Sequence, residues 1–97
     1  MLPIRLTPEA ECEYQAAIRW FERNRKGRGK RFSAAVREVF HSIQIAPDRW
    51  PFEIDNVRHA VVSGFSYSIF YRVEPGMIEV VSVFHQHRDP QEWLDRI

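Results

Sequence analysis

The sequence predicts an α+β fold with the element order β-α-α-β-β-β, in which two helices cover one face of a sheet. Apolar residues alternate over residues 67–73, and β-branched residues dominate residues 77–84, a pattern typical of two long neighbouring strands. Two upstream segments repeat apolar residues at the helical period instead, and a short alternating segment precedes them. We therefore expect a sheet whose centre is the last pair of strands.

The chain opens with a short strand over residues 2–6, where Leu2, Ile4 and Leu6 alternate with other residues. Pro3 has no backbone donor, so this strand should lie at a sheet edge. Thr7 is a suitable N-cap for a first helix, whose apolar stripe supplies a helix-to-sheet contact. That stripe is formed by Ala10, Tyr14, Ala17, Ile18 and Phe21, and Cys12, Ala16 and Trp20 should widen it, which places Cys12 in the core.

Residues 24–29 are polar and basic and contain two glycines, which is typical of a tight connection between helices. A second helix should end near Ala46, because Pro47 disfavours helical geometry at the residue before it. With so short a link the two helices should form an antiparallel hairpin. The apolar stripe of the second helix consists of Phe32, Ala35, Val36, Val39, Phe40 and Ile43.

Residues 48–56 show no periodicity, so we expect a loop whose Trp50 and Phe52 fold back onto the core. A strand over residues 57–63 follows. Between the two long strands, Pro75 and Gly76 favour a type II turn. After Pro90 the tail has room for a turn or two of helix.

The composition bounds the class of protein. A chain of 97 residues supports one hydrophobic core, which predicts a single domain over residues 1–97. The formal net charge of +1 argues against a bulk polycation, although basic residues gather in residues 19–31. Cys12 is the single cysteine, so no intramolecular disulfide can form, which fits a reducing compartment. With no membrane-spanning or signal segment, we expect a soluble cytoplasmic protein without a membrane partner.

Short motifs at defined spacings run through nearly the whole chain. They are Thr-Pro-Glu-Ala at 7–10, Trp20-Phe21, Gly-Arg-Gly-Lys-Arg-Phe at 27–32, Pro47 with Trp50-Pro51, Arg58 opening a strand, residues 65–73, and His85-x-x-Arg88-x-Pro90-x-x-Trp93. In this order they resemble the RelE/ParE toxins of type II toxin–antitoxin pairs, and the ParE-like branch in particular. The resemblance implies a helical hairpin packed on a curved, mainly antiparallel sheet. It also implies a cognate antitoxin that wraps the toxin, with DNA contacted only through the antitoxin.

The resemblance leaves two kinds of target open. RelE-like members are similar to ribosome-dependent nucleases that cut messenger RNA, whereas ParE-like members act on DNA gyrase. Those nucleases carry an arginine after the tyrosine matched by Tyr67, where this chain has Ser68, although Arg88 does match their catalytic arginine. In the preceding strand, where they carry basic residues, this chain has Val61 and only Arg58 and His59. The departures favour a gyrase inhibitor; a messenger-RNA endoribonuclease and an antitoxin-binding member without toxicity are the alternatives.

A nuclease would need an acid, a base and cations around the phosphate. His85 and His87 could serve as acid and base, with Arg88, Arg72 and Arg58 as charge stabilisers; otherwise the two histidines only cap the sheet rim. His-x-His also places two rings on one strand face, so a metal is conceivable. A third ligand would have to come from His59, His41 or Cys12, none of which has a diagnostic spacing, so we predict neither a metal nor another cofactor.

The predicted antitoxin seat is an open face of the sheet next to the edge strand marked by Pro3. Its residues are Arg58, Arg72, His85, Arg88 and Trp93, which would receive an acidic, partly disordered antitoxin segment. Two of these residues have a structural interpretation as well. Arg72 should face away from the helices and can pair with Glu79, and Trp93 can serve as an apolar lid instead of an interface anchor.

Overall fold

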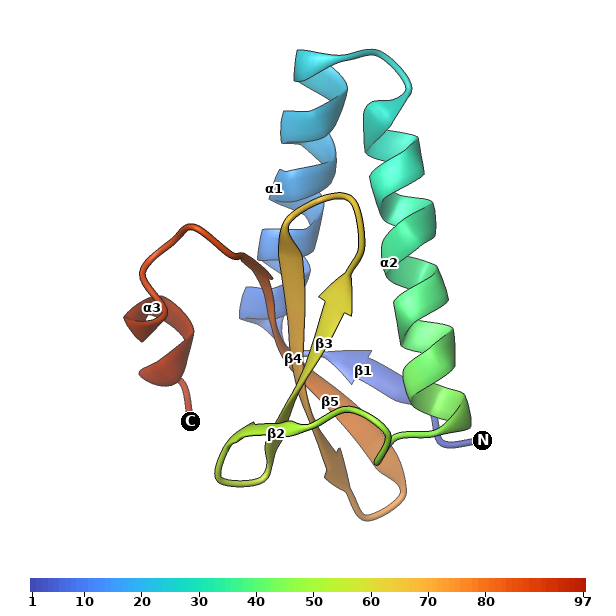
Figure 1. Cartoon of the computed structure of the whole chain (residues 1–97), viewed down its shortest axis with the longest axis vertical. Coiled ribbons are helices and arrows are strands. Elements are labelled where there is room, and N and C mark those ends of the chain that lie inside the picture. Colours follow the sequence, from blue (N-terminus) through green and yellow to red (C-terminus); the bar gives the residue numbers. More distant parts are fainter.

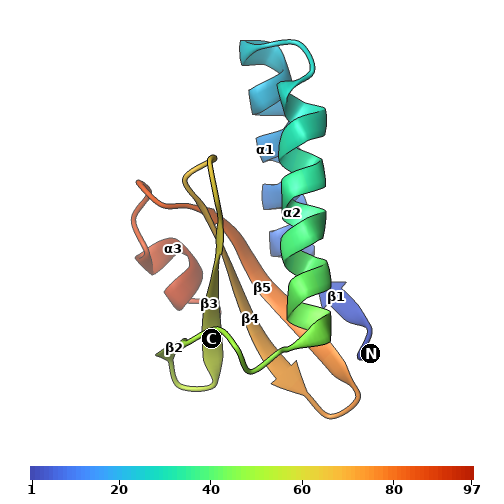
Figure 2. The same cartoon turned by 45° about the vertical axis from the view of Figure 1, so that its right-hand side comes forward.

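In the computed structural model, which describes residues 1–97, a five-stranded sheet separates a helical hairpin on one face from a short helix on the other (Figure 1, Figure 2). In chain order the elements are β1 (Ile4–Leu6), α1 (Pro8–Asn24), α2 (Arg28–Ile45), β2 (Phe52–Ile54), β3 (Val57–Val62), β4 (Tyr67–Glu74), β5 (Met77–His85) and α3 (Gln91–Leu94). The strand order is β1-β5-β4-β3-β2, and only the β1–β5 pair is parallel. The predicted α+β class, the edge position of β1 and the helical hairpin are confirmed.

The ends of the two helices explain how the hairpin closes. Thr7 caps α1 by accepting a hydrogen bond from the backbone N of Ala10 at 3.1 Å. The first turn of α2 contains no acidic residue and no side-chain cap of its own. Glu22 of α1 supplies one, because its carboxylate accepts from the backbone N atoms of Gly27 at 3.0 Å and Gly29 at 3.1 Å. A negative charge at a helix N-terminus is stabilising, so the link and α2 are held by α1.

The core has two parts, one on each face of the sheet. On the first face the stripes of α1 and α2 meet the side chains of β3, β4 and β5 that point toward them. On the second face α3 contributes Trp93, whose ring stacks on Phe70 with centroids 3.9 Å apart. Because successive strand residues point to opposite faces, burial of both faces requires the almost continuous apolar sequence of β4 and β5. The second cluster consists of Val57, Phe70, Val81, Phe84 and Trp93.

A bulge in β5 changes which residues face the helices. Ser82 pairs with Phe70 and Val80 pairs with Tyr71, so Val81 has no opposite residue on β4. The short strand β1 pairs only with residues 78–80 of β5, and beyond it Glu13 of α1 accepts from the backbone N of Val83 at 3.1 Å. This contact occupies a backbone donor that would otherwise be unpaired.

Three expectations about the fold are wrong. The predicted loop over residues 48–56 contains β2, which pairs antiparallel with β3. The sequence does not indicate this strand, because its three residues are all exposed and leave no apolar alternation. Phe52 is 59% exposed and its ring lies under the Arg58 guanidinium, 3.8 Å away, whereas Trp50 does pack on the core. Cys12, Ala16 and Trp20 are exposed, because their row of α1 turns away from α2 and the sheet.

None of the helices is both long and apolar enough to cross a membrane.

Candidate partner-binding groove

The arginines expected on one open face of the sheet lie on opposite faces. Arg58 stands opposite Tyr71, on the helix side, and its Nη1 donates to the carbonyl oxygens of Asp48 at 3.1 Å and Trp50 at 2.6 Å. Arg72 lies on the other face, where its Nε is 2.8 Å from Oε1 of Glu79, as the alternation predicted. The expected shared face is therefore wrong, because the β3–β4 register puts residues 58 and 72 on opposite sides.

Trp93 occupies the centre of the second face. Only 2% of the residue is exposed, and its ring is stacked on Phe70 among the apolar side chains of β3, β4 and β5. This is the geometry of a lid. With Trp93 in this position the second face is covered, and its indole presents no free surface to a partner.

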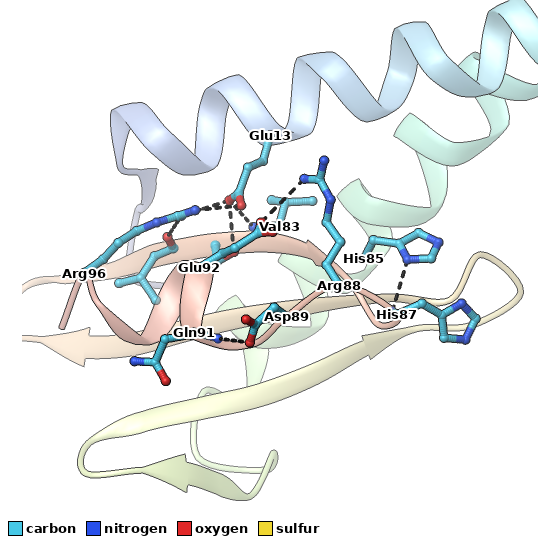
Figure 3. Close-up of polar contacts among 11 residues, drawn as sticks. Glu13, Val83, His85, His87, Arg88, Asp89, Gln91, Glu92 and Arg96 are labelled. Carbon is cyan, nitrogen blue, oxygen red and sulfur yellow. Dashed lines mark hydrogen bonds and ion pairs between the residues drawn. The ribbon is translucent and has the colours of Figure 1, made fainter.

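His85, His87 and Arg88 gather where β5 ends, close to α1 (Figure 3). Nδ1 of His85 accepts a hydrogen bond from the backbone N of His87 at 3.1 Å, and the two rings are 5.0 Å apart. Burial lowers the pKa of His85, and the nearby His87 and Arg88 lower it further, so His85 is neutral near pH 7. Of the three arginines proposed as charge stabilisers for a nuclease centre, only Arg88 lies beside this histidine pair, because Arg58 and Arg72 are engaged elsewhere.

His85 and Arg88, but not His87, form one wall of a groove of about 400 Å³ between α1 and the end of β5, which we call the α1–β5 groove. Trp20 and Arg23 on α1 form the opposite wall, with Tyr67 of β4 between the walls. Burial raises the pKa of Tyr67, so its phenol is a neutral donor at physiological pH. The full lining is Glu13, Ala16, Ala17, Trp20, Arg23, Tyr67, Val83, His85 and Arg88.

Glu13 is the one acidic residue of the groove, and it is already neutralised. Its Oε1 accepts from Nη1 of Arg96 at 3.0 Å and from Oγ of Ser82 at 2.9 Å, and its Oε2 from Nη2 of Arg96 at 2.8 Å (Figure 3). Nη1 of Arg96 also donates to the carbonyl oxygen of Val81 at 3.1 Å. The hydrogen bond to Glu13 raises the pKa of Arg96. This arrangement, the Glu13–Arg96 clamp, ties the C-terminal tail to α1 and β5.

The remaining cations of the groove have no close carboxylate. Arg23 takes part in none of the ion pairs of the chain, and the side chain of Arg88 is 62% exposed with Glu92 no nearer than 3.8 Å. Such a weak exposed pair leaves most of the charge of Arg88 available. The groove therefore combines two accessible guanidinium groups with the exposed ring of Trp20. It is suited to an anion attached to an apolar group.

Sequence reasoning found His85 and Arg88 but missed Trp20 and Arg23. Trp20 was assigned to the core stripe of α1, and Arg23 was read as part of the basic link. Ala16, Trp20 and Arg23 are spaced by four and three residues, so they share one helix face, and the charge of Arg23 on that face is the signal that it is exposed. Nowhere in the chain do three His, Cys, Asp or Glu side chains converge on one point where a metal ion could bind.

Comparison with known proteins gives one family match and two similar solved structures. A family model described as the ParE toxin of the type II toxin–antitoxin system, parDE, matches residues 4–90. A solved structure of the chromosomal ParDE system from P. aeruginosa has a TM-score of 0.65 at 15% identity, covering 88% of this chain and 96% of that one. The YoeB dimer from Staphylococcus aureus has a TM-score of 0.61 at 17% identity, covering 84% and 93%. The curated proteins include no match to the sequence.

Proposed function

Because the chain belongs to the ParE toxin family of type II toxin–antitoxin systems, we propose that it inhibits DNA gyrase by direct contact and is silenced by a cognate antitoxin. The family match over residues 4–90 is the observation that carries this proposal. The placement of the basic residues favours it over a nuclease. A nuclease centre needs several cations around one phosphate, whereas Arg58 and Arg72 here bind backbone carbonyls and a carboxylate on opposite faces of the sheet.

The antitoxin is proposed to bind in the α1–β5 groove instead of on the second face of the sheet. Trp93 and α3 already cover that second face, and Arg58 and Arg72 are already paired. In the groove, Arg23 and Arg88 are available and Glu13 does not compete for them, because Arg96 neutralises it. Complementary charge steers association and fixes the register of a complex. An exposed tryptophan next to arginines is also a common interface anchor.

This arrangement favours an acidic antitoxin segment with at least one apolar side chain. A carboxylate would lie between Arg23 and Arg88, and the apolar side chain would pack on the exposed face of Trp20. Arginine binds carboxylates through two parallel hydrogen bonds, so a single acidic side chain can engage one guanidinium group fully. A flexible acidic segment that becomes ordered in the groove would suit this geometry.

The gyrase proposal is tested by a supercoiling assay with purified gyrase, relaxed plasmid and the purified chain. We expect supercoiling to stop as the chain is added in excess and to recover when the antitoxin is added. Full supercoiling at a large excess of folded chain would remove gyrase as the target. Primer extension on messenger RNA incubated with ribosomes and the chain tests the nuclease alternative, and discrete cleavage products would support it.

The antitoxin seat is tested by reversing the charge of each groove arginine. Arg23→Glu and Arg88→Glu should each weaken antitoxin binding at least tenfold, or about 1.4 kcal/mol, measured by titration calorimetry. Arg31→Glu is the matched control, because Arg31 is an exposed arginine at the start of α2 outside the groove. Unchanged affinity in both groove variants, or an equal loss in the control, would place the antitoxin elsewhere.

A further inference from the structure

Three side chains on the second face of the sheet form a continuous chain of hydrogen bonds. Nδ1 of His59 on β3 is 3.1 Å from Oε1 of Glu53 on β2. Nε2 of the same ring is 2.7 Å from Oγ of Ser68 on β4. A carboxylate, an imidazole and a hydroxyl therefore follow one another across three neighbouring strands.

The hydrogen-bond roles follow from the chemistry of each group. A carboxylate only accepts, so the ring nitrogen that faces Glu53 carries the hydrogen in the neutral imidazole. Nε2 is then the unprotonated nitrogen, and it accepts the hydrogen of the Ser68 hydroxyl. The ring of His59 also packs on Phe70, with centroids 4.7 Å apart, which limits its rotation. This is the relation of nucleophile, base and orienting carboxylate in serine hydrolases.

The chain of hydrogen bonds borders a pocket of about 400 Å³. This pocket is distinct from the α1–β5 groove, and Arg88 is the one lining residue that the two share. Phe70, Phe84, Trp93 and Leu94 give this pocket an apolar wall, and Ser68 lines it while being only 2% exposed. The Ser68 hydroxyl is therefore shielded from water, whereas the side chains of His59 and Glu53 next to it are 29% and 45% exposed. The size of the pocket suits small substrates.

The pocket also holds a hydrogen-bond donor for a developing negative charge. Nε2 of Gln86 lines the pocket 3.4 Å from Oγ of Ser68, so a carbonyl oxygen bound beside the hydroxyl would lie near this donor. The indole of Trp93 supplies only apolar wall, because its Nε1 is buried out of reach of a ligand.

We propose that Ser68 is a nucleophile activated by His59 and positioned with the help of Glu53, and that this pocket hydrolyses small carboxylic esters with an apolar acyl group. Ser68 Oγ attacks the ester carbonyl carbon while its proton moves to Nε2 of His59. The C–O bond to the alcohol breaks, and the alcohol leaves with the proton from His59. Water then attacks the acyl-serine, His59 takes the water proton and returns it to Ser68, and the carboxylic acid is released. This activity is independent of gyrase inhibition.

The test is covalent labelling of the whole folded chain with a small alkyl fluorophosphonate. The Ser68 oxygen forms a bond to phosphorus, the P–F bond breaks, fluoride leaves, and the proton passes through His59 to solvent. We expect one adduct per chain by intact mass, located on Ser68 by peptide mapping. Ser68→Ala should abolish the adduct, whereas Ser63→Ala, which changes an exposed serine in the β3–β4 turn, should label like the wild type.

Variants of the other two residues separate catalysis from simple structural support. His59→Gln should slow labelling at least about 100-fold, the lower end for general-base catalysis, with circular dichroism unchanged. Glu53→Gln should lower the maximal rate of labelling more than it changes the probe concentration at half-maximal rate, because Glu53 orients the base. Hydrolysis of p-nitrophenyl acetate should be lost in Ser68→Ala while gyrase inhibition is kept. No adduct on the folded chain, an adduct on another residue, or labelling of Ser68 that is unaffected by His59→Gln would overturn the proposal.

Discussion

Replacing Glu13 by alanine should destabilise the fold more than any surface change on α1. The carboxylate of Glu13 accepts hydrogen bonds from the guanidinium of Arg96, the hydroxyl of Ser82 and the backbone N of Val83. Its removal leaves Arg96 without its counter-charge and the backbone N–H of Val83 without its acceptor. The side chains of Arg96 and Glu13 are 22% and 14% exposed, so most of this loss occurs away from bulk water.

The expected magnitude follows from these contacts. Removing one partner of a fully buried pair costs about 3–5 kcal/mol, and partial exposure of this pair places it at the lower end. An unpaired backbone N–H adds about 1–3 kcal/mol when water cannot reach it, but the space left by Glu13 opens to the α1–β5 groove. We therefore expect Glu13→Ala to lower the free energy of unfolding by about 3 kcal/mol. Domains of this kind have about 5–15 kcal/mol in total.

The assay is urea denaturation followed by far-ultraviolet circular dichroism and tryptophan fluorescence. Glu13→Gln keeps an oxygen acceptor for Val83 and should lose about half as much. Glu11→Ala, an exposed change on the same helix, is the matched control and should stay within about 0.5 kcal/mol. A double-mutant cycle with Arg96→Ala should give a coupling energy of at least about 1 kcal/mol. A loss below about 0.5 kcal/mol in Glu13→Ala, or no coupling to Arg96, would refute the clamp.

Three further predictions concern the hairpin, the groove and the core. Gly29→Ala places a Cβ 2.6 Å from a backbone oxygen of α1 and should lower the free energy of unfolding in urea by about 2–3 kcal/mol. Gly27→Ala meets open space and should lower it by only about 1 kcal/mol, because of the φ of 87° at this residue. Arg88→Gln should raise the pKa of His85 in an NMR titration, because a neighbouring positive charge is removed; an unchanged pKa would contradict the proximity of these groups. Burial raises the pKa of Tyr71 to about 12 from its ordinary value of 10.0. The unfolded chain therefore loses this proton first as pH rises above 10, and stability falls until the folded state also titrates near pH 12. Tyr71→Phe should lessen the decrease between about pH 10 and about pH 12.

The elements predicted correctly are those in which burial repeats along the sequence. The stripes of the two helices and the alternation in β4 and β5 follow directly from which side chains are buried. β2 has no buried residue, so its strand geometry comes from pairing with β3 and leaves no pattern in the sequence. Likewise, the bulge at Val81 depends on the strand register and has no local signal.

The candidate sites depend on tertiary contacts that no single segment contains. Alternation correctly placed Arg72 away from the helices, but the face of Arg58 required the β3–β4 register. The α1–β5 groove brings Arg23 next to Arg88, which lies far along the chain. In the sequence, Ser68 is notable only because it stands where the nucleases carry an arginine. Its hydrogen bond to His59 depends on the pairing of β3 with β4, which the sequence does not specify.

The central claim, that this toxin acts on gyrase, is tested most directly by following the first macromolecular change after induction in cells without antitoxin. Plasmid topology on chloroquine gels and primer extension on abundant transcripts are measured from the same samples over time. We expect plasmids to lose negative supercoiling before transcripts change, and co-expressed antitoxin to prevent this loss. Cleaved transcripts in cells whose plasmids keep normal supercoiling would contradict it.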